Sequence, residues 1–324
     1  MSGAPRHTAL VAFVVTAIAV LAVFPHVAEP YYVTLVLPAF AYAIALLGFN
    51  LLFGTTGLLS FGHALFVAIG AYAAAVMTSK LGLRSFELIL VVAGVVAVIA
   101  AIPVALLAVR YVRIFFGILT LAFGMLFHSF LFKFYDLTGG DTGIRVLRPT
   151  LLGQEWKELD KTAFLIGPFY YACLLLAVVL GVVMWRVVHS PFGLHLAAIR
   201  ENPIKAEYLG VRVRRFRLLA FLISAFYCAI GGVILAVNTG QADPELAYWT
   251  HSGELVFMTV LGGFASFFGP VVGAFTFVFL KSELMGLTQY WRFCLGATLA
   301  VIVIVFPRGL IGLAKDASRK AAKR

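Results

Sequence analysis

Apolar residues follow one another in long runs, separated by short polar stretches. The runs are about 20 residues long, the length that an α-helix needs to cross a hydrocarbon core about 30 Å thick. Because backbone groups in lipid must find their hydrogen-bond partners within the segment, such runs predict helices. We therefore predict an all-α fold, a polytopic transmembrane helical bundle of about eight to ten hydrophobic segments. The expected segments are residues 8–24, 31–53, 61–78, 88–109, 114–132, 163–185, 218–238, the interrupted stretch 253–280, and 291–306.

Glycines break two of these segments. The interrupting residues are Gly54, Gly57 and Gly62 in the first, and Gly262, Gly263, Gly269 and Pro270 in the second. We expect both halves of 253–280 to be too short to span upright, so this stretch is re-entrant or discontinuous. Backbone that leaves a helix at membrane depth is tolerated only where protein or a water-filled cavity covers it. Two broken segments in one chain point to a transport pathway. The alternative is that the glycines only permit close packing, as the GxxxG spacing of Gly269 and Gly273 allows.

The residues at the breaks are our candidates for a translocation path. They are Asn50, Gly54, Gly57, Ser60, His63, Glu254, Gly262 and Gly263. Each has a plainer interpretation beside the functional one. His63 is equally compatible with a packed, hydrogen-bonded histidine, and Asn50 with a hydrogen bond to a neighbouring helix. Glu254 is expected in a first helical turn, where the helix dipole alone favours a carboxylate.

Composition agrees with a membrane location. Apolar residues make up 62% of the 324 residues and charged residues 12%, and the mean hydropathy is +1.02. A soluble domain carries about twice that charged fraction. Cys173, Cys228 and Cys294 lie singly in apolar runs, so no metal site is expected. No nucleophile–base pair is evident either, so we expect no catalytic residues in this chain.

The net charge of +11 is concentrated in short stretches beside apolar segments. It forms no basic face of the kind that binds nucleic acid, so we expect no nucleic-acid partner. Residues 186–217 hold seven basic and two acidic residues, and 308–324 hold six and one, whereas 133–162 hold five of each. By the positive-inside rule, 186–217 and the tail 308–324 are cytoplasmic and 133–162 is periplasmic. An even number of membrane crossings must then lie between 186–217 and the tail. Segments 218–238 and 291–306 supply two, so 253–280 contributes none or two.

The basic loop 186–217 contains two helix-start signals. Ser190-Pro191 and Asn202-Pro203 each place a side-chain acceptor at the N-cap and a proline at the first helical position. We expect a second, short helix from Pro203 to about Leu209, ended by Gly210 in a left-handed conformation. Its apolar side would be formed by Ile204, Tyr208 and Val211. The alternative is an amphipathic surface loop without a partner.

Several stretches in a fixed order resemble one known family. They are NLLFGTTGLLSFGHALF from Asn50, TGGDTGI from Thr138, SPFG from Ser190, AIRENPIKAEYLG from Ala198, SGELVFMTVLGG from Ser252, FGPVVGA from Phe268 and FPRGLIGL from Phe306. Together they resemble the permease subunits of ATP-binding cassette importers for branched-chain amino acids, specifically the longer of the two permease types. The resemblance implies a permease domain at residues 1–307, followed by the basic tail. It also implies that the glycine turn after Thr138 lies near the outer mouth.

In this family the stretch ending at Gly210 is the coupling helix, which sits in a groove of the ATPase. The resemblance assigns that role to Arg200, Glu201, Asn202, Ala206, Glu207 and Gly210. This chain has Lys205-Ala206 where the family usually has two alanines, and Leu194-His195 where an arginine–alanine pair is usual. No GxxxxGK[ST] stretch occurs. We therefore expect no cofactor on this chain and ATP on separate subunits.

The resemblance implies partners as well: ATPase subunits, a second homologous permease in a heterodimer, a periplasmic substrate-binding protein and the bilayer of a bacterial inner membrane. The expected function is import of branched-chain or other hydrophobic amino acids. Related permeases for urea, amides or aromatic acids stay open as an alternative. A secondary transporter driven by an ion gradient would need ionisable relay residues inside its spans. Here the uninterrupted segments hold almost none, with Glu254 at a boundary and Glu283 just beyond one. A structural scaffold explains neither the breaks nor the capped helix.

Overall fold

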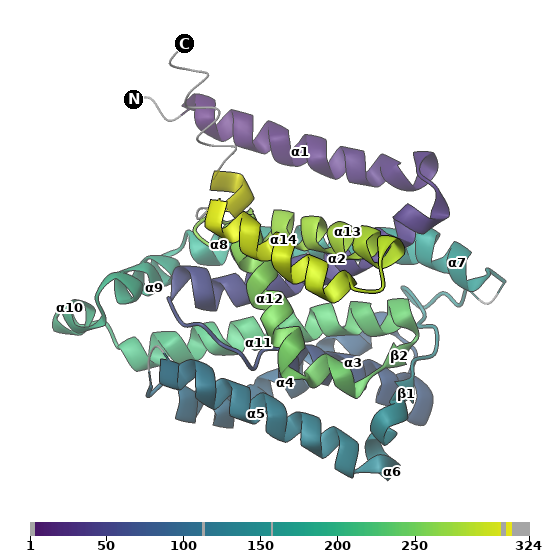
Figure 1. Cartoon of the computed structure of the whole chain (residues 1–324), viewed down its shortest axis with the longest axis horizontal. Coiled ribbons are helices and arrows are strands. Elements are labelled where there is room, and N and C mark those ends of the chain that lie inside the picture. The colour runs from purple at the N-terminus through teal and green to yellow at the C-terminus, as the bar shows by residue number, and fades with distance from the viewer. Residues whose placement is uncertain (1–3, 112–113, 157, 306–308, 313–324) are drawn as a thin grey trace.

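A computed structural model describes residues 4–111, 114–156, 158–305 and 309–312 of the chain (Figure 1). These residues form fourteen α-helices with short π and 3₁₀ turns, and one antiparallel pair of two-residue strands. Six helical stretches among them are long and apolar enough to cross a membrane. The predicted helical membrane bundle is confirmed. Most predicted segments agree with the observed helices to within a few residues.

The core is built around α11 (Val213–Thr239), which packs mainly against α2 (Pro30–Asn50), α3 (Ala64–Ala75) and α4 (Phe86–Ala108). Small residues permit this closeness. A Cβ atom on Gly232 would overlap the backbone carbonyl of Val67, and one on Gly70 would overlap that of Ala229. In a bilayer, where apolar side chains gain nothing by leaving lipid, such close backbone packing is a main source of helix association.

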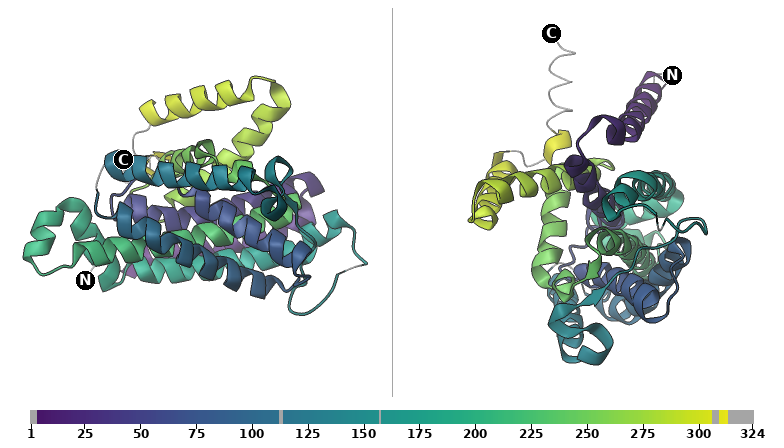
Figure 2. Two further views of the ribbon diagram at one scale, coloured as in Figure 1. Left: turned by 90° about the horizontal axis from the view of Figure 1, so that it is seen from below. Right: turned by 90° about the vertical axis from the view of Figure 1, so that its right-hand side faces the viewer.

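The remaining long helices surround this core. They are α1 (Ala4–Val27), α5 (Ile114–Lys133), α8 (Tyr170–Val188), α12 (Trp249–Gly262), α13 (Gly269–Leu287) and α14 (Trp291–Val305). The short α7 (Lys161–Phe164) and the π turn η4 (Leu165–Phe169) lead into α8, and the π turn η2 (Val76–Lys80) ends α3. Helices α1 and α14 extend away from the bundle in different directions (Figure 2). The outward side of α4 is apolar, with Val91, Val95 and Ile99 exposed, as expected of a face in contact with lipid.

The loops gather at two opposite ends of the bundle. At one end, which we call the inner end, lie α9 (Pro191–Glu201) and α10 (Pro203–Tyr208) (Figure 1). At the other, the outer end, lie α6 (Tyr135–Thr138), η3 (Gly140–Thr142), β1 (Ile144–Arg145) and η5 (Pro244–Ala247), with β1 paired to β2 (Gln241–Ala242). The predicted glycine turn after Thr138 is confirmed, since Gly139, Gly140 and Gly143 all have positive φ.

The interrupted stretch 253–280 forms a helical hairpin. Helices α12 and α13 pack against each other and are joined by residues 263–268, which lie at the inner end. The prediction that both halves are too short is wrong for α13, which has 19 residues and continues to Leu287. In the sequence Lys281 ends the apolar run, whereas in the structure it forms an ion pair with Glu254 of α12 and the helix continues past it. Helix α12, with 14 residues, is shorter than the helices long enough to span, so the prediction holds for this half.

The end of the described chain returns to the inner end. Gly309 lies against Gly263, so closely that a Cβ atom on Gly309 would meet the Gly263 backbone. Phe306–Arg308 and residues 313–324 lie outside the described residues, and with them nearly all of the predicted basic tail.

Candidate functional site

The first break follows η1 (Leu51–Thr55), a π-helical turn at the end of α2. Residues 56–63 are non-helical, and α3 begins at Ala64. Three hydroxyl groups accept hydrogen bonds from the freed backbone amides: Thr120 from Phe61 (3.3 Å), Ser60 from Gly62 (3.3 Å) and Ser252 from Ala64 (3.0 Å). The expectation that protein covers the broken backbone is confirmed. Ser252 belongs to α12, so its bond also links the two broken segments.

His63 is packed in the interior. Its Nδ1 lies 2.7 Å from the hydroxyl of Ser60, and its ring is 5.1–5.4 Å from the rings of Phe49, Phe66 and Phe221. Both His63 and Ser60 are fully buried. Of the two interpretations of His63, the packed one agrees with this structure. Neither residue lines either of the two cavities described below.

A cavity of about 290 Å³, the inner cavity, lies at the inner end between three parts of the chain that are distant in sequence. These are the end of α2 with η1, the helices α8 and α9, and the loop 263–268. The predicted site residues on its wall are Asn50, Gly54, Arg200 and Glu201. The expectation that Asn50 bonds a neighbouring helix is wrong for its Oδ1, which is buried without a partner among the described residues. Gly54 packs against this oxygen, and a Cβ atom at position 54 would overlap it.

Arg200 connects the loop helices to both breaks. Its guanidinium donates a hydrogen bond to the carbonyl oxygen of Gly54 and lies over the ring of Phe264, 5.6 Å from the centroid. Gly57, with φ of +78°, lies against the same side chain, since a Cβ atom there would be 3.0 Å from Arg200 Cγ. Gly54 and Gly57 belong to the first broken segment and Phe264 to the second. Sequence reasoning placed Arg200 on a surface for the ATPase and did not find this contact.

The loop 263–268 is held tightly at the same end. Trp185 of α8 stacks on Phe268, with 5.7 Å between centroids, and contacts Phe267 edge to face at 4.9 Å. Gly263 has φ of +106°, and a Cβ atom on Gly262 would overlap the backbone carbonyl of Gly269. Gly262 and Gly263 therefore make a tight turn and a close helix contact. They lie beside the inner cavity but are not part of its wall.

The predicted short helix is confirmed. It is α10, six residues long, and Asn202 caps it by accepting a hydrogen bond from the amide of Lys205 at 3.0 Å. Gly210 follows in the left-handed region with φ of +85°. The first start signal was partly wrong: Ser190 precedes α9, but its hydroxyl donates to the carbonyl of Val187 at 2.7 Å and caps nothing. The physical reason is that α8 ends just before Ser190, so the Val187 carbonyl is close enough to accept the hydrogen bond from its hydroxyl.

The surface of α10 differs from the expected one in two positions. Ile204, Tyr208 and Leu209 are exposed by 64%, 87% and 84%, whereas the expected third member, Val211, is half-buried. Ala206 is 2% exposed because it packs beneath the helix. A direct contact of Ala206 with a partner is therefore excluded in this conformation. Glu201 and Glu207 are exposed.

Glu254 is not in a first helical turn. Helix α12 begins at Trp249, and the Glu254 carboxylate accepts a hydrogen bond from Lys281 Nζ at 2.8 Å. His251 Nδ1 is 3.5 Å from its other oxygen. The helix-dipole explanation is thus replaced by an ion pair between α12 and α13. Sequence reasoning missed Lys281 because it follows the assigned segment by one residue; extending the apolar pattern to Leu287 finds it.

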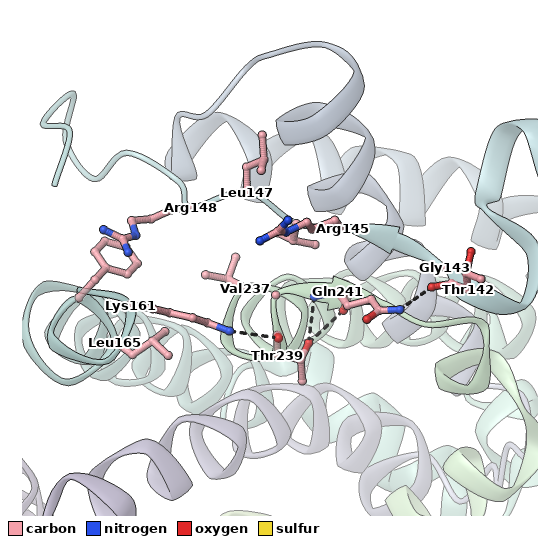
Figure 3. A pocket seen from close by; sticks show the side chains of 13 residues that line it. Thr142, Gly143, Arg145, Leu147, Arg148, Lys161, Leu165, Val237, Thr239 and Gln241 are labelled. Carbon is pink, nitrogen blue, oxygen red and sulfur yellow. Dashed lines mark hydrogen bonds between the residues drawn. The ribbon is translucent and has the colours of Figure 1, made fainter. Parts of the chain in front are cut away.

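A larger cavity of about 650 Å³, the outer cavity, opens at the outer end (Figure 3). Arg145, Arg148 and Lys161 line it, and none of the described residues on its wall is acidic. Arg148 donates to the carbonyls of Trp156 and Leu159, and Lys161 Nζ lies 3.3 Å from the carbonyl of Thr239. The loop 133–162 is balanced in charge along the sequence, yet its folding gathers cations on this wall. No group of three or more potential metal ligands occurs among the described residues.

Comparison with known proteins places the chain in a family. The family model described as "Branched-chain amino acid transport system / permease component" matches residues 31–305. The permease LivM of the high-affinity branched-chain amino acid transport system of Escherichia coli K12 is 30% identical over 295 residues, 85% of this chain and 68% of that protein. The permease LivH of the same organism is 24% identical over 84% of this chain and 91% of its own length. A galactose/methyl galactoside import permease, MglC of Haemophilus influenzae, is 24% identical over 61% of this chain and 60% of its own length. No solved structure matches.

Proposed function

Because the chain belongs to the family of permease components of branched-chain amino acid transport systems, we propose that it forms one half of the path through a bacterial inner membrane for such an amino acid. The chain is a multi-pass permease subunit of an ATP-binding cassette importer. LivM and LivH are both named as permeases of a branched-chain amino acid system in one organism, and this chain resembles both. That likeness supports a second, homologous permease as its partner in a heterodimer.

The observation that carries the mechanism is the contact of Arg200 with both breaks. The exposed side chains of Ile204, Tyr208 and Leu209 give α10 an apolar surface suited to a groove on an ATPase subunit. Arg200 lies in the last turn of the adjoining helix α9 and contacts Gly54 and Phe264 at the inner cavity. When ATP draws the ATPase subunits together, α9 and α10 move as one, and Arg200 shifts the two breaks relative to each other. The path then opens or closes at the inner end.

The other predicted coupling residues support this role in two ways. Glu201 and Glu207 are exposed and meet the ATPase as charged groups. Asn202 and Gly210 set where α10 begins and ends, so they act through its shape. ATP is bound and hydrolysed on the separate subunits, and this chain binds no cofactor and carries out no chemistry.

In the proposed orientation the inner end, with the C-terminal tail, is cytoplasmic. The basic excess of residues 186–217 supports it. The outer cavity then faces the periplasm. Its three cationic side chains would receive carboxylates on the docking surface of a periplasmic substrate-binding protein, which delivers the amino acid.

Reconstitution tests the proposal. The chain would be placed in proteoliposomes with its second permease and ATPase subunits, and leucine uptake measured with the binding protein and ATP. We expect uptake only when all components and ATP are present. Uptake by this chain alone, driven by a proton gradient without ATP, would contradict it. Uptake of urea, amides or aromatic acids in place of leucine would assign the chain to a related importer.

A further inference from the structure

A charged residue lies inside one of the membrane-spanning helices. Lys281 belongs to α13, whose residues Gly269–Leu287 are long and apolar enough to cross a bilayer. It lies twelve residues after the start of that helix, about 18 Å along its axis. Glu254 of α12 lies opposite. Ionisable residues at such depth are costly and rare, and they usually belong to a substrate or ion path.

The two side chains form a pair that is open on one side. Lys281 Nζ and Glu254 Oε1 are 2.8 Å apart, and the side chains are 29% and 24% exposed. His251, which is 9% exposed, holds the second carboxylate oxygen from behind at 3.5 Å. The rings of Trp291 and Phe277 lie 5.5 Å and 5.9 Å from the ammonium group. The pair is therefore held in place on the protein side and accessible from the other.

The accessible side of this pair does not suit contact with lipid. A face turned to hydrocarbon is apolar, as on α4, where Val91, Val95 and Ile99 are the exposed residues. Here the exposed face of α12 carries Glu254, with Phe257 one turn further on and 49% exposed. A partly exposed ion pair in a membrane span faces either water or protein. Since the permease is proposed to form only half of a path, this face lies toward the path.

We propose that Glu254 and Lys281 form a substrate site in the path that binds zwitterionic α-amino acids by exchange of ion pairs. In the empty site the two charges neutralise each other. An arriving amino acid replaces each partner, with its ammonium group on Glu254 and its carboxylate on Lys281, so that no charge is left unpaired at membrane depth. Trp291, which is partly buried, and Phe257 provide apolar surface for an aliphatic side chain. His251 positions Glu254, and neighbouring Ser252 ties the site to the first break through Ala64.

This inference rests on the proposed function, because it names the chemical groups by which that path recognises its cargo. Uptake kinetics alone are a poor test, since the binding protein sets the concentration dependence. The measurement is therefore the reaction of a cysteine at position 257 with a membrane-impermeant, cationic thiol reagent in the complete transporter. The background carries Cys294→Ser, because Cys173 and Cys228 are buried. The matched control is Val95→Cys on the lipid-facing side of α4.

We expect Phe257→Cys to react and Val95→Cys to stay unreacted. Leucine should slow the reaction at position 257 at least fivefold. Leucinamide, which lacks the carboxylate, and 4-methylpentanoate, which lacks the ammonium group, should not. Glu254→Gln and Lys281→Gln should each abolish the protection, and Lys281→Arg should retain it. The comparison of the three ligands needs no change in the pair, so it stands even where a charge variant fails to assemble.

An unreactive Phe257→Cys, or equal protection by all three ligands, would overturn the inference. Protection by leucine that persists in both glutamine variants would do so as well. ATP-dependent leucine uptake by the unmodified transporter is measured in the same vesicles. If that uptake is absent, the proposed function fails; if it is present and protection is absent, only the exchange site fails.

Discussion

The guanidinium of Arg200 is hydrogen-bonded to the carbonyl oxygen of Gly54, 146 positions earlier in the chain. This contact joins a helix of the inner-end loop to the point where α2 gives way to non-helical backbone. The same side chain covers the ring of Phe264 in the turn between α12 and α13. One residue of α9 thus contacts both broken segments.

Replacing this side chain should separate ATP hydrolysis from transport. In Arg200→Met the apolar stem remains, but the hydrogen bond to Gly54 and the cation–π contact are lost. We expect leucine uptake to fall at least tenfold, with membrane abundance and basal ATP hydrolysis near those of the unmodified transporter. Arg215→Met, which removes an exposed charge from the start of α11, is the matched control and should transport normally. Equal uptake by both variants would show that Arg200 does not couple ATP hydrolysis to transport.

Gly210 offers a test of the shape of α10. It has φ of +85° and no atom within 4 Å of the position a Cβ would take, so the effect of Gly210→Val is confined to the backbone. A left-handed β-branched residue costs about 1–2 kcal/mol. We expect uptake to fall steeply at normal abundance. Asn202→Ala should act in the same direction more mildly, because a lost N-cap costs about 1 kcal/mol.

Gly82 provides the matched control for Gly210. It has φ of +69° and equally open surroundings, but it lies at the outer end after α3. Gly82→Val therefore imposes a similar backbone strain away from the proposed ATPase surface, and uptake should persist. If the two valine variants lose uptake equally, strain in general and not the shape of α10 is responsible.

Gly54→Ala tests the contact between the two breaks. The added methyl group would overlap Asn50 Oδ1 and the carbonyl oxygen of Phe264, so η1 and the loop 263–268 must move apart. We expect a lower melting temperature of the purified transporter and reduced uptake. Gly181→Ala on α8, where the nearest atom is a Leu47 methyl at 4.0 Å, should change neither. A melting temperature unchanged in Gly54→Ala would argue against this contact.

The proposed orientation is accessible to thiol labelling in intact cells. Leu152 at the outer end is 88% exposed, so a cysteine there should react with an impermeant reagent. A cysteine at Ser318, in the basic tail outside the described residues, should be protected until the membrane is opened. The reverse pattern would invert the assignment of both ends.

The charge of the outer cavity leads to a prediction about docking of the binding protein. Arg145 lines it, and its guanidinium has no partner among the described residues, so Arg145→Glu changes the charge of the wall without breaking an internal bond. We expect the concentration of loaded binding protein that half-stimulates ATP hydrolysis to rise several-fold, with basal hydrolysis unchanged. Arg84→Glu, an exposed residue at the same end but outside the cavity wall, is the control. A similar loss in both would indicate general electrostatic attraction only.

Features encoded by near neighbours in the chain were predictable from the sequence. Apolar runs gave the spans because each helix satisfies its own backbone in lipid. The start and stop of α10 followed from Asn202, Pro203 and Gly210, whose effects act within one helical turn. The position of both breaks followed from glycines in the same way.

Contacts across the bundle were decided only by the tertiary fold. Arg200 and Gly54, or Glu254 and Lys281, meet because helices pack at particular angles and heights, which no single-helix pattern records. The same packing buries Ala206, which was expected on the ATPase surface, and encloses His63 among three aromatic rings, where the sequence left two interpretations open. Periodicity tells which residues share a face of one helix. The partner of that face lies on another segment, brought close by glycine contacts such as Gly232 on Val67.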